Sequence, residues 1–239
     1  ATSMTQTAII TGASSGIGAA AAALFLNAGF AVINISRRPC PVSGVTDLCG
    51  DLSDRKSVQE LTRSLSAHLK DTQPESVCLV HNAALMLKDT ADDTDDASLA
   101  TVLQINTLAI NNLNRELLPL MPSGSSVLFV GSTLSEKAVK GAFSYVVSKH
   151  AQLGMMRATC QDLMGRGIHT ALICPGFTDT EMLRNHIGQD QKIVEAISSM
   201  NSFGRLVEPE EIARLIVWAH SNPVINGAVL HGNLGQVEH

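Results

Sequence analysis

Tyr145 and Lys149 form the pair of residues in this chain whose types and spacing most directly suggest chemistry. Residues four apart share one face of a helix, so both side chains would project together. A lysine cation beside a phenol favours the phenolate and lowers the tyrosine pKa, which makes proton transfer near neutral pH feasible. A lone pair of this kind also occurs on ordinary amphipathic helices, so both interpretations stay open at this point.

A glycine-rich stretch, Thr11–Gly18, follows a short apolar run and precedes an alanine-rich segment. This order predicts a strand, a tight turn and a helix, whose first N–H groups and positive end can bind a phosphate. Gly12 would permit the turn, Gly16 would let main chain approach a pyrophosphate, and Gly18 would let the helix lie close. The alternative is a turn without a ligand. The residues predicted to bind a dinucleotide here are Gly12, Ser14, Ser15, Gly16, Ile17 and Gly18.

The end of the second predicted strand carries Ser36, Arg37 and Arg38. In a dinucleotide fold this position faces the adenosine ribose, where arginine attracts a 2′-phosphate and an acidic residue repels it. The prediction is therefore NADP(H), with NAD(H) as the alternative and two solvated arginines as the interpretation without a ligand. Asp51, which precedes Leu52, would contact the adenine amino group, cap the following helix, or do both.

Two polar residues stand out within apolar surroundings. Asn106 belongs to a helical stripe, and a buried amide needs hydrogen-bond partners, so periodicity alone favours a structural role. His81 ends an apolar run and is interpreted as a surface histidine at a strand end. The stripe consists of Leu99, Leu103, Asn106, Ile110, Leu113 and Leu117.

Strands are predicted to alternate with helices along the whole chain. The expected fold is α/β, a Rossmann-like doubly wound parallel sheet of about seven strands with helices on both faces, in three layers. One domain, 1–239, is expected, with residues 177–203 as a substrate lid. Predicted strands are 7–10, 30–35, 45–48, 77–80, 127–130, 168–173 and 228–230, and predicted helices include 54–69, 98–120, 144–164 and 209–220.

Composition limits the classes of partner. The formal charge is −5 at pH 7 and the only basic cluster is Arg37–Arg38, which argues against nucleic acid and anionic membranes and favours a small molecule. Five cysteines without paired spacing predict reduced thiols in a cytoplasmic protein, and the acidic tract 92–96 lacks metal-loop spacing, so no metal is expected. No apolar run reaches membrane-spanning length. Residues 1–3 are set aside as a vector remnant.

Taken together, these motifs give the chain a resemblance to the short-chain dehydrogenase/reductase family over nearly its whole length. Ser132 lies thirteen residues before Tyr145, as in that family. The resemblance rests on Thr11–Gly18, Asn82–Ala83–Ala84, Asn106, Ser132, Tyr145 with Lys149, Pro175–Gly176, Thr180, and their order.

The resemblance implies an oxidoreductase that transfers a hydride between NADP(H) and a carbonyl or secondary alcohol. Tyr145 would be the general acid or base, Ser132 would hydrogen-bond the substrate oxygen, and Lys149 would bind the nicotinamide ribose. Asn106 would hold a water that links Lys149 to solvent. Further cofactor contacts are implied for Asn82, Ala83, Ala84, Pro175, Gly176, Thr178 and Thr180. A homotetramer or homodimer is also implied.

The sequence departs from the family pattern at His81–Asn82–Ala83–Ala84 and at Asn233–Leu234–Gly235, and Ser15 replaces a basic residue common in NADP-dependent members. A non-catalytic NADP(H)-binding sensor or regulator therefore stays as an alternative. Reduction of a carbon–carbon double bond is disfavoured, because enoyl reductases space the tyrosine and lysine more widely. The substrate pocket is expected to be apolar, with polar anchors; it would contain Leu134, Ala138, Val139, Phe177, Arg184 and His186.

Overall fold

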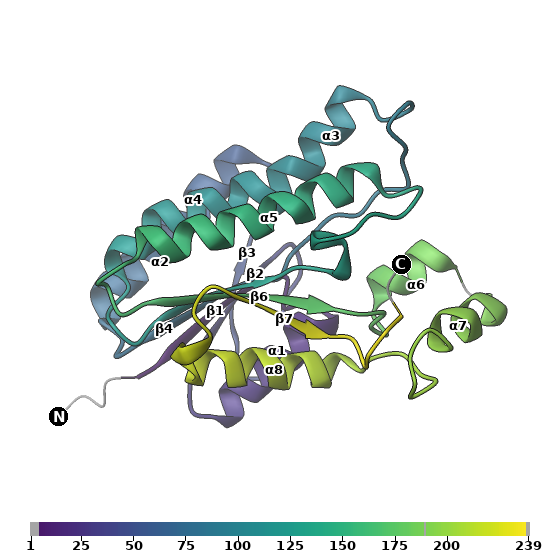
Figure 1. Cartoon of the computed structure of the whole chain (residues 1–239). Coiled ribbons are helices and arrows are strands. Elements are labelled where there is room, and N and C mark those ends of the chain that lie inside the picture. Colours follow the sequence, from purple (N-terminus) through teal and green to yellow (C-terminus); the bar gives the residue numbers. More distant parts are fainter. Residues whose placement is uncertain (1–4, 189, 238–239) are drawn as a thin grey trace.

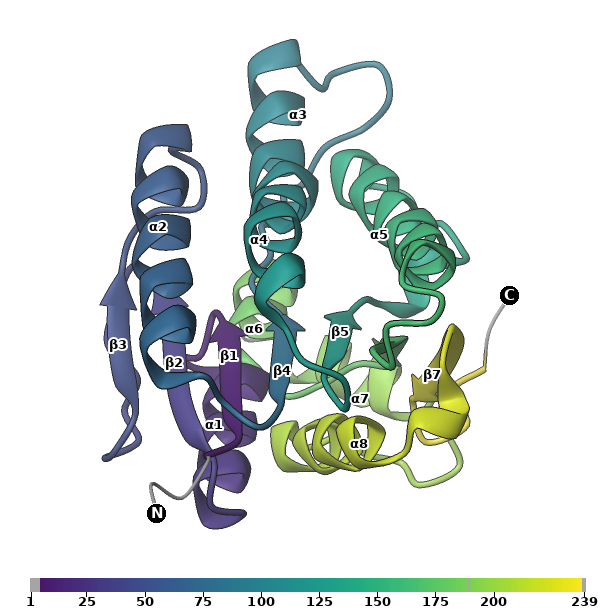
Figure 2. The same cartoon turned by 90° about the vertical axis from the view of Figure 1, so that its left-hand side faces the viewer.

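The computed structural model describes residues 5–188 and 190–237, and within these ranges seven parallel strands form one sheet. The strand order is β3-β2-β1-β4-β5-β6-β7, so β2 and β3 lie on one side of β1, and β4 to β7 follow on the other side. Figures 1 and 2 show helices covering both faces of this sheet. The predicted three-layer, doubly wound fold is confirmed. Residues 1–3, set aside above, lie outside the described residues.

The predicted strands and helices are present with small shifts at their ends. The strands are β1 Thr7–Thr11, β2 Ala31–Ser36, β3 Thr46–Cys49, β4 Val77–His81, β5 Ser126–Val130, β6 His169–Pro175 and β7 Ala228–Gly232. The main helices are α1 Gly16–Asn27, α2 Arg55–Thr72, α3 Asp96–Leu103, α4 Ala109–Leu117, α5 Phe143–Asp162, α6 Glu181–Ile187, α7 Gln191–Ser198 and α8 Pro209–Ser221.

Alternating side chains of the central strands supply two separate cores. Ile9 and Ile33 face one side, where α2, α4 and α5 pack, and Ala8 and Ile10 face the other, where α1 and α8 pack. Because successive side chains of a strand point to opposite faces, a sheet buried on both sides reads as a continuous apolar run. This arrangement explains why β1, β4 and β5 are buried along their whole length.

The helix predicted over 98–120 is not a uniform α-helix. Between α3 and α4 the chain makes a π-helical turn, Gln104–Leu108, and it ends in a 3-10 turn, Leu118–Leu120. The wider turn shifts the buried face, so Val102 and Gln104 are buried in place of the predicted Leu99 and Leu103. Asn106 lies within this turn and is fully buried. Single π turns often lie at functional sites.

Three histidines are buried against the sheet, and the interpretation of His81 as a surface residue was wrong. His81 is 2% exposed, and its Nε2 lies 2.7 Å from Oδ1 of Asn114 in α4. Burial lowers its pKa to about 4. His220 of α8 is buried beside His169 of β6, and its Nδ1 lies 2.7 Å from Oγ of Ser126. Burial lowers the pKa of His220 to about 4 as well.

The segment predicted as a lid contains α6 and α7, which lie beyond one end of the sheet (Figure 1). Thr180 caps α6 and Asp190 caps α7, each by accepting a backbone N–H with its side-chain oxygen. The chain rejoins the sandwich at α8. None of the helices in the described ranges has the length and apolar character needed to cross a bilayer.

Candidate active site

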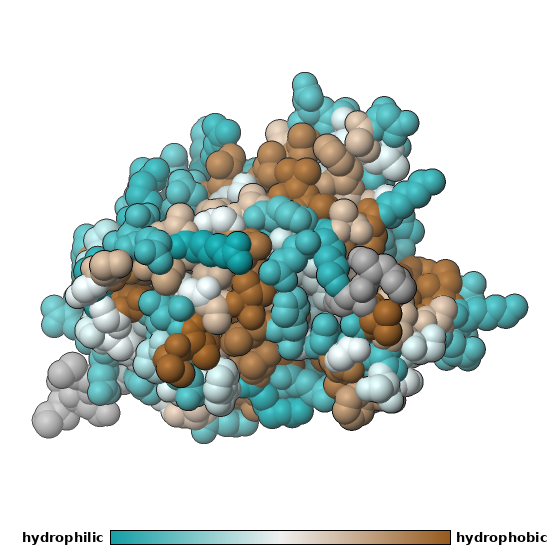
Figure 3. Space-filling model, viewed as in Figure 1, coloured by the Kyte–Doolittle hydropathy of each residue, from teal (hydrophilic) through white to brown (hydrophobic). Residues whose placement is uncertain are grey.

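A cleft of about 690 Å³ opens at the carboxyl ends of the parallel strands, where the strand order reverses between β1 and β4. Clefts at this position are the usual ligand sites of open α/β sheets. The lining extends from the glycine turn after β1, past the ends of β2, β4, β5 and β6, to α6 and Met200. On the face shown in Figure 3, apolar and polar side chains are mixed at the right of the view, where α6 and α7 lie.

Nearly all predicted site residues line this cleft. The predicted residues in its lining are Gly12, Ser14, Ser15, Gly16, Ile17, Ser36, Arg37, Arg38, Asp51, Leu52, Asn82, Ala83, Ala84, Ser132, Tyr145, Lys149, Pro175, Gly176, Thr178 and Thr180. Gly18 and Asn106 are not in the lining, but they contact the lining residues Gly12 and Leu85.

The glycine turn is held open by hydrogen bonds from neighbouring strands. Asn82 Nδ2 donates to the carbonyl oxygens of Thr11 and Gly12, at 3.1 and 3.2 Å, and the Thr11 hydroxyl accepts from the Asn82 and Ala83 N–H groups. Asn34 Oδ1 accepts the Ala13 N–H at 3.0 Å. These bonds fix the turn from both sides.

The glycines of the turn are required by geometry. Gly12 has φ +76°, and a Cβ there would lie 3.0 Å from Ala83 Cα. A Cβ on Gly18 would lie 2.3 Å from the Gly12 carbonyl oxygen, so the first turn of α1 packs directly on the loop. Together with the start of α1 at Gly16, this cradle fits a pyrophosphate bound by backbone N–H groups.

The end of the cleft beside β2 is basic, with two acidic residues close by. The Ser36 hydroxyl donates to the Arg38 carbonyl, which shapes the chain after β2. The Arg38 guanidinium lies 3.5 Å from the Glu181 carboxylate at the start of α6, so this exposed ion pair crosses the mouth of the cleft. Arg37 lines the cleft near Asp51.

Asp51 does not cap the following helix, so this alternative was wrong. Its Oδ1 accepts the N–H and hydroxyl of Ser53, and these bonds, with a smaller effect of Arg37, hold its pKa below the usual value. Asp54 is the cap of α2 and accepts the Lys56 N–H. Asp51 itself lies in the lining, so the contact with adenine stays a prediction.

Tyr145 and Ser132 meet on the opposite wall. Tyr145 lies in the first turn of α5 and Ser132 follows β5, and the Ser132 hydroxyl lies close enough to the phenol to lower its pKa. The Ser132 oxygen also accepts the Leu134 N–H at 3.1 Å, which fixes the serine as the cap of a short 3-10 turn. When a substrate oxygen takes the place of this mutual contact, each of the two hydroxyls can donate one hydrogen bond to it.

Lys149 lies beside Tyr145 as predicted, but its effect on the phenol is different. Its Nζ is 5.3 Å from the centre of the tyrosine ring and donates to the Val130 carbonyl at 2.9 Å and to Gln152 Oε1 at 3.2 Å. Burial raises the pKa of Tyr145 to about 12, although the Ser132 hydroxyl opposes this. The expected lowering of the tyrosine pKa is therefore absent, because desolvation of the phenolate is the largest effect and outweighs that of the Ser132 hydroxyl. Burial also lowers the pKa of Lys149 to about 8.

Asn106 connects the cleft wall to α5. Its Oδ1 accepts the Leu85 N–H, and its Nδ2 donates to the Leu85 carbonyl and to the Ser148 hydroxyl, all at 2.8 to 2.9 Å. The side chain is thus fully engaged by protein groups, in agreement with the structural role that periodicity favoured. Its backbone carbonyl accepts the Gln152 amide at 2.9 Å.

The part of the cleft lined by the segments that follow β5 and β6 is apolar with a basic part. The predicted lining residues Leu134, Ala138, Val139 and Phe177 are present, joined by Met86, Ile105, Met182 and Met200. His186 and Lys137 also line it, and burial, helped by the charge of Lys88, lowers the pKa of His186. Arg184 is outside the lining, because its guanidinium makes two bonds to Asp179, at 2.8 and 3.0 Å.

Sequence reasoning missed several residues that position this site. Asn34 holds the glycine turn, Glu181 pairs with Arg38, and Gln152 binds Lys149. The signal for Gln152 was available, because it continues the spacing of Tyr145 and Lys149 by three more residues on the same helix face. No comparable pattern marked Asn34, whose role depends on contact between β2 and the turn.

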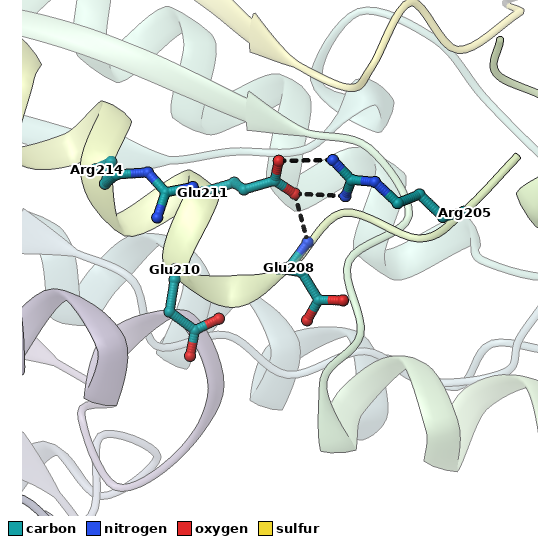
Figure 4. A pocket seen from close by; sticks show the side chains of 5 residues that line it. All are labelled: Arg205, Glu208, Glu210, Glu211 and Arg214. Carbon is teal, nitrogen blue, oxygen red and sulfur yellow. Dashed lines mark hydrogen bonds and ion pairs between the residues drawn. The ribbon is translucent and has the colours of Figure 1, made fainter. Parts of the chain in front are cut away.

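A shallow surface pocket of about 290 Å³ lies apart from the cleft, at the start of α8. Figure 4 shows Arg205 facing Glu211, and the Glu208 N–H donates to the same carboxylate. The two N–O distances between Arg205 and Glu211 are 2.7 and 2.8 Å. These charges satisfy one another and fix the point at which the lid segment joins α8. Within the described ranges, no group of three metal-binding side chains is found, and all five cysteines are free thiols.

Comparison with known proteins agrees with this geometry. The family described as Enoyl-(Acyl carrier protein) reductase matches residues 12–236. The A-factor type gamma-butyrolactone 1'-reductase (1S-forming) of Streptomyces virginiae is 32% identical over 222 residues, covering 88% of this chain and 86% of that protein. A short chain dehydrogenase family protein of Francisella tularensis is 25% identical, with a TM-score of 0.87 and 98% of each chain covered. A 3-oxoacyl (acyl-carrier-protein) reductase of Agrobacterium tumefaciens, solved with NADP bound, is 24% identical with a TM-score of 0.85, and the match covers 96% of this chain and 93% of that chain.

The fold, the cleft and these similarities define an oxidoreductase built on a dinucleotide-binding sheet. The chain belongs to the short-chain dehydrogenase/reductase family.

Proposed function

We propose that this protein is an NADP(H)-dependent carbonyl reductase. The observation that carries the proposal is the neighbouring pair of hydroxyls of Ser132 and Tyr145, with Lys149 beside the phenol, on the wall of a cleft whose other end is the glycine turn. One cleft thus joins a phosphate cradle to a proton donor. The family relation supports an oxidoreductase, and the residues support the particular reaction.

The residues divide the work of the reaction. NADPH, when bound, supplies the hydride that the carbonyl carbon accepts. Ser132 and Tyr145 donate hydrogen bonds to the substrate oxygen where negative charge develops, and Tyr145 then gives up its proton to that oxygen. Lys149 stays cationic beside the phenol and stabilises the phenolate that this step leaves. Gly12 and Gly16 would hold the pyrophosphate, and Arg37 and Arg38 the 2′-phosphate.

The state of Tyr145 favours reduction over oxidation. A phenol with a pKa of about 12 is protonated at neutral pH, which is the form that donates a proton to a carbonyl oxygen. Oxidation of an alcohol needs the phenolate as base, so its rate would rise with pH. We therefore place the reductive direction first.

The pocket beside Tyr145 suits a carbonyl compound with an apolar body. Leu134, Val139 and Met182 form apolar walls, while Lys137 and His186 lie where a polar or anionic end group of the substrate would reach. The similarity to a butyrolactone reductase supports a ketone of moderate size. The description of the matching family names an enoyl reductase. The spacing of Tyr145 and Lys149, four residues apart, supports carbonyl reduction instead.

The test is to follow NADPH absorbance with ketones, β-keto thioesters, aldehydes and, as a separate arm, an α,β-unsaturated thioester. We expect turnover with carbonyl compounds. Turnover with the unsaturated thioester alone would replace the proposed reaction by double-bond reduction. Tight NADPH binding without turnover in any arm would instead support the non-catalytic sensor. The homotetramer or homodimer stays a prediction, measured by sedimentation.

Cofactor preference gives a further prediction. Arg37→Asp is expected to weaken NADPH binding at least about tenfold more than NADH binding, because a carboxylate replaces the cation facing the 2′-phosphate. Fluorescence titration of both cofactors measures the two dissociation constants. Arg63→Asp, on the exposed face of α2, is the matched control and should leave both affinities unchanged. Equal affinity of the unmodified protein for NADPH and NADH would contradict this preference.

A further inference from the structure

One face of α5 carries a continuous row of polar residues that are buried. Tyr145, Ser148, Lys149 and Gln152 follow one another at steps of three, one and three, so all four project from one side of the helix. Gln152 is 1% exposed and does not line the cleft. A glutamine amide so deeply buried is costly unless both of its polar atoms are bound.

Both polar atoms of Gln152 are bound, and they connect two parts of the site. Its Oε1 accepts a hydrogen bond from Lys149 Nζ at 3.2 Å, and its Nε2 donates to the Asn106 carbonyl at 2.9 Å. The amide therefore forms a direct bridge between the lysine ammonium and the π-helical turn. A single amide can make both bonds, because its oxygen is an acceptor and its nitrogen is a donor.

This bridge accounts for much of the placement of Lys149. An ammonium has three N–H donors. One goes to the Val130 carbonyl at 2.9 Å and one to Gln152, so among the described residues one donor is left for a ligand in the cleft, which Lys149 lines. Without the Gln152 acceptor, the buried cation would lose one of its two protein partners.

The other end of the bridge is fixed equally well. Asn106 lies in the π turn, where its side chain binds Leu85 and Ser148, so its backbone cannot shift without breaking three further hydrogen bonds. A carbonyl oxygen has two lone pairs and can accept the Gln152 amide in addition to a helical N–H. An apolar residue at 152 would leave this carbonyl with one bond fewer.

We propose that Gln152 is a positioning residue for the reaction: its amide fixes the Lys149 ammonium beside Tyr145 by tying it to the Asn106 carbonyl. The inference rests on the proposed function for its effect on turnover, but the bridge itself can be measured without any substrate. Because a neutral amide neither gains nor loses a proton near neutral pH, the bridge holds charge in place and does not conduct protons from Lys149 toward Asn106.

The ionisation of Lys149 reports the bridge directly. Among the described residues, the titratable groups that act on it are Tyr145 of α5 and Cys174 of β6. Burial raises the pKa of Cys174 to about 11 and that of Tyr145 to about 12, so both are uncharged when Lys149 titrates near 8. A change in the lysine titration after substitution of Gln152 therefore reflects the lost or altered amide.

The experiment is an NMR titration of the protein labelled with ¹³C at lysine Cε, with the Lys149 signal assigned from Lys149→Met. Gln152→Met keeps length and removes the acceptor, and Gln152→Glu replaces it by a carboxylate. We expect the Lys149 pKa to fall by about one unit in Gln152→Met and to rise by about one unit in Gln152→Glu. Met156→Ala, one turn beyond Gln152 on α5, changes a buried residue that makes none of the hydrogen bonds of the bridge, and it controls for general loosening of the helix.

The same variants test the consequence for turnover. The pH above which kcat/KM for carbonyl reduction declines should move with the Lys149 pKa, downward for Gln152→Met and upward for Gln152→Glu, and stay unchanged for Met156→Ala. An unmoved Lys149 titration in both Gln152 variants would overturn the inference, as would a shift of equal size in Met156→Ala. A shifted titration in a protein that turns over no carbonyl compound would uphold the bridge and refute the proposed function instead.

Discussion

Replacing Tyr145 by phenylalanine is expected to lower kcat/KM for carbonyl reduction about a thousandfold, while the dissociation constant of NADPH changes little. The substitution removes one hydroxyl, which is both the proton donor and one of the two hydrogen-bond donors to the substrate oxygen. Ser132 remains, but its hydroxyl loses the neighbouring phenol oxygen. Because the ring is kept, the packing of Lys149 over it is kept as well. Steady-state rates and NADPH fluorescence measure the two quantities separately.

Ser144→Ala is the matched control for this experiment. It also deletes one buried hydroxyl, from the residue next to Tyr145, and that oxygen has no hydrogen-bond partner among the described residues. Its removal should leave kcat/KM within about twofold and stability unchanged or slightly raised, since no bond is lost. If Tyr145→Phe retains the activity of the unmodified protein while Ser144→Ala does too, the tyrosine has no part in the chemistry.

Mild acid is expected to destabilise the protein strongly. His81 and His220 are buried in neutral form with pKa values of about 4, whereas an unfolded histidine titrates near 6.5. The folded pKa is the lower one, so stability is complete above about pH 6.5 and is lost as the pH falls from there toward 4. At pH 5 each of the two histidines should cost about 2 kcal/mol of unfolding free energy. The pKa of His169 is also lowered by burial and adds in the same direction.

Urea unfolding at pH 7.5, 6 and 5 measures this loss. His81→Gln removes one titrating group, so the decrease between pH 7.5 and 5 should shrink by about 2 kcal/mol. His150→Gln, at an exposed position of α5, is the control and should leave the decrease intact. Carboxylates with lowered pKa values, such as Asp51 and Glu211, lose their contribution only as the pH falls below about 4, so they do not blur this window. A decrease that is the same in His81→Gln would exclude His81 as its cause.

The sequence contains enough local information to predict the sheet. Continuous apolar runs such as 77–80 mark strands buried on both faces, and the caps and glycines between them mark the turns, so the order of elements follows without knowledge of contacts. The edge strand β3 was predicted within one residue although it is largely exposed. The periodicity of apolar residues is a property of each segment by itself, which explains why it predicts the strands and helices well.

The features that were missed depend on how segments meet. A π turn has no signature in hydrophobic spacing, so the stripe from Leu99 was extended through it with a regular period. His81 resembles any polar residue after a strand, and only the packing of α4 over β4 buries it beside Asn114. The pKa of Tyr145 was expected to be low because the lysine was counted and the loss of solvent was not.

The residues that line the candidate site were predicted, but the residues that hold them in position were not. Residues that belong to contiguous motifs, such as the glycine turn or Tyr145 with Lys149, could be named, and they line the cleft. Their roles in catalysis stay predictions until the substitutions are made. The supporting amides of Asn34 and Gln152 come from other segments or from the next helical turn, and their value becomes visible only with the distances to Ala13 and Lys149.

The π turn at Gln104–Leu108 also sets a limit on how this helix can vary in length. A chain one residue shorter between Asp96 and Ala109 could form an uninterrupted α-helix of better intrinsic geometry. Each residue of an α-helix turns the backbone by about 100°, so such a deletion would rotate either Asn106 away from α5 or the apolar face of α4 away from the sheet. The extra residue lets one helix satisfy two differently directed surfaces, and we expect this segment to tolerate substitutions on its solvent side far better than a change of length.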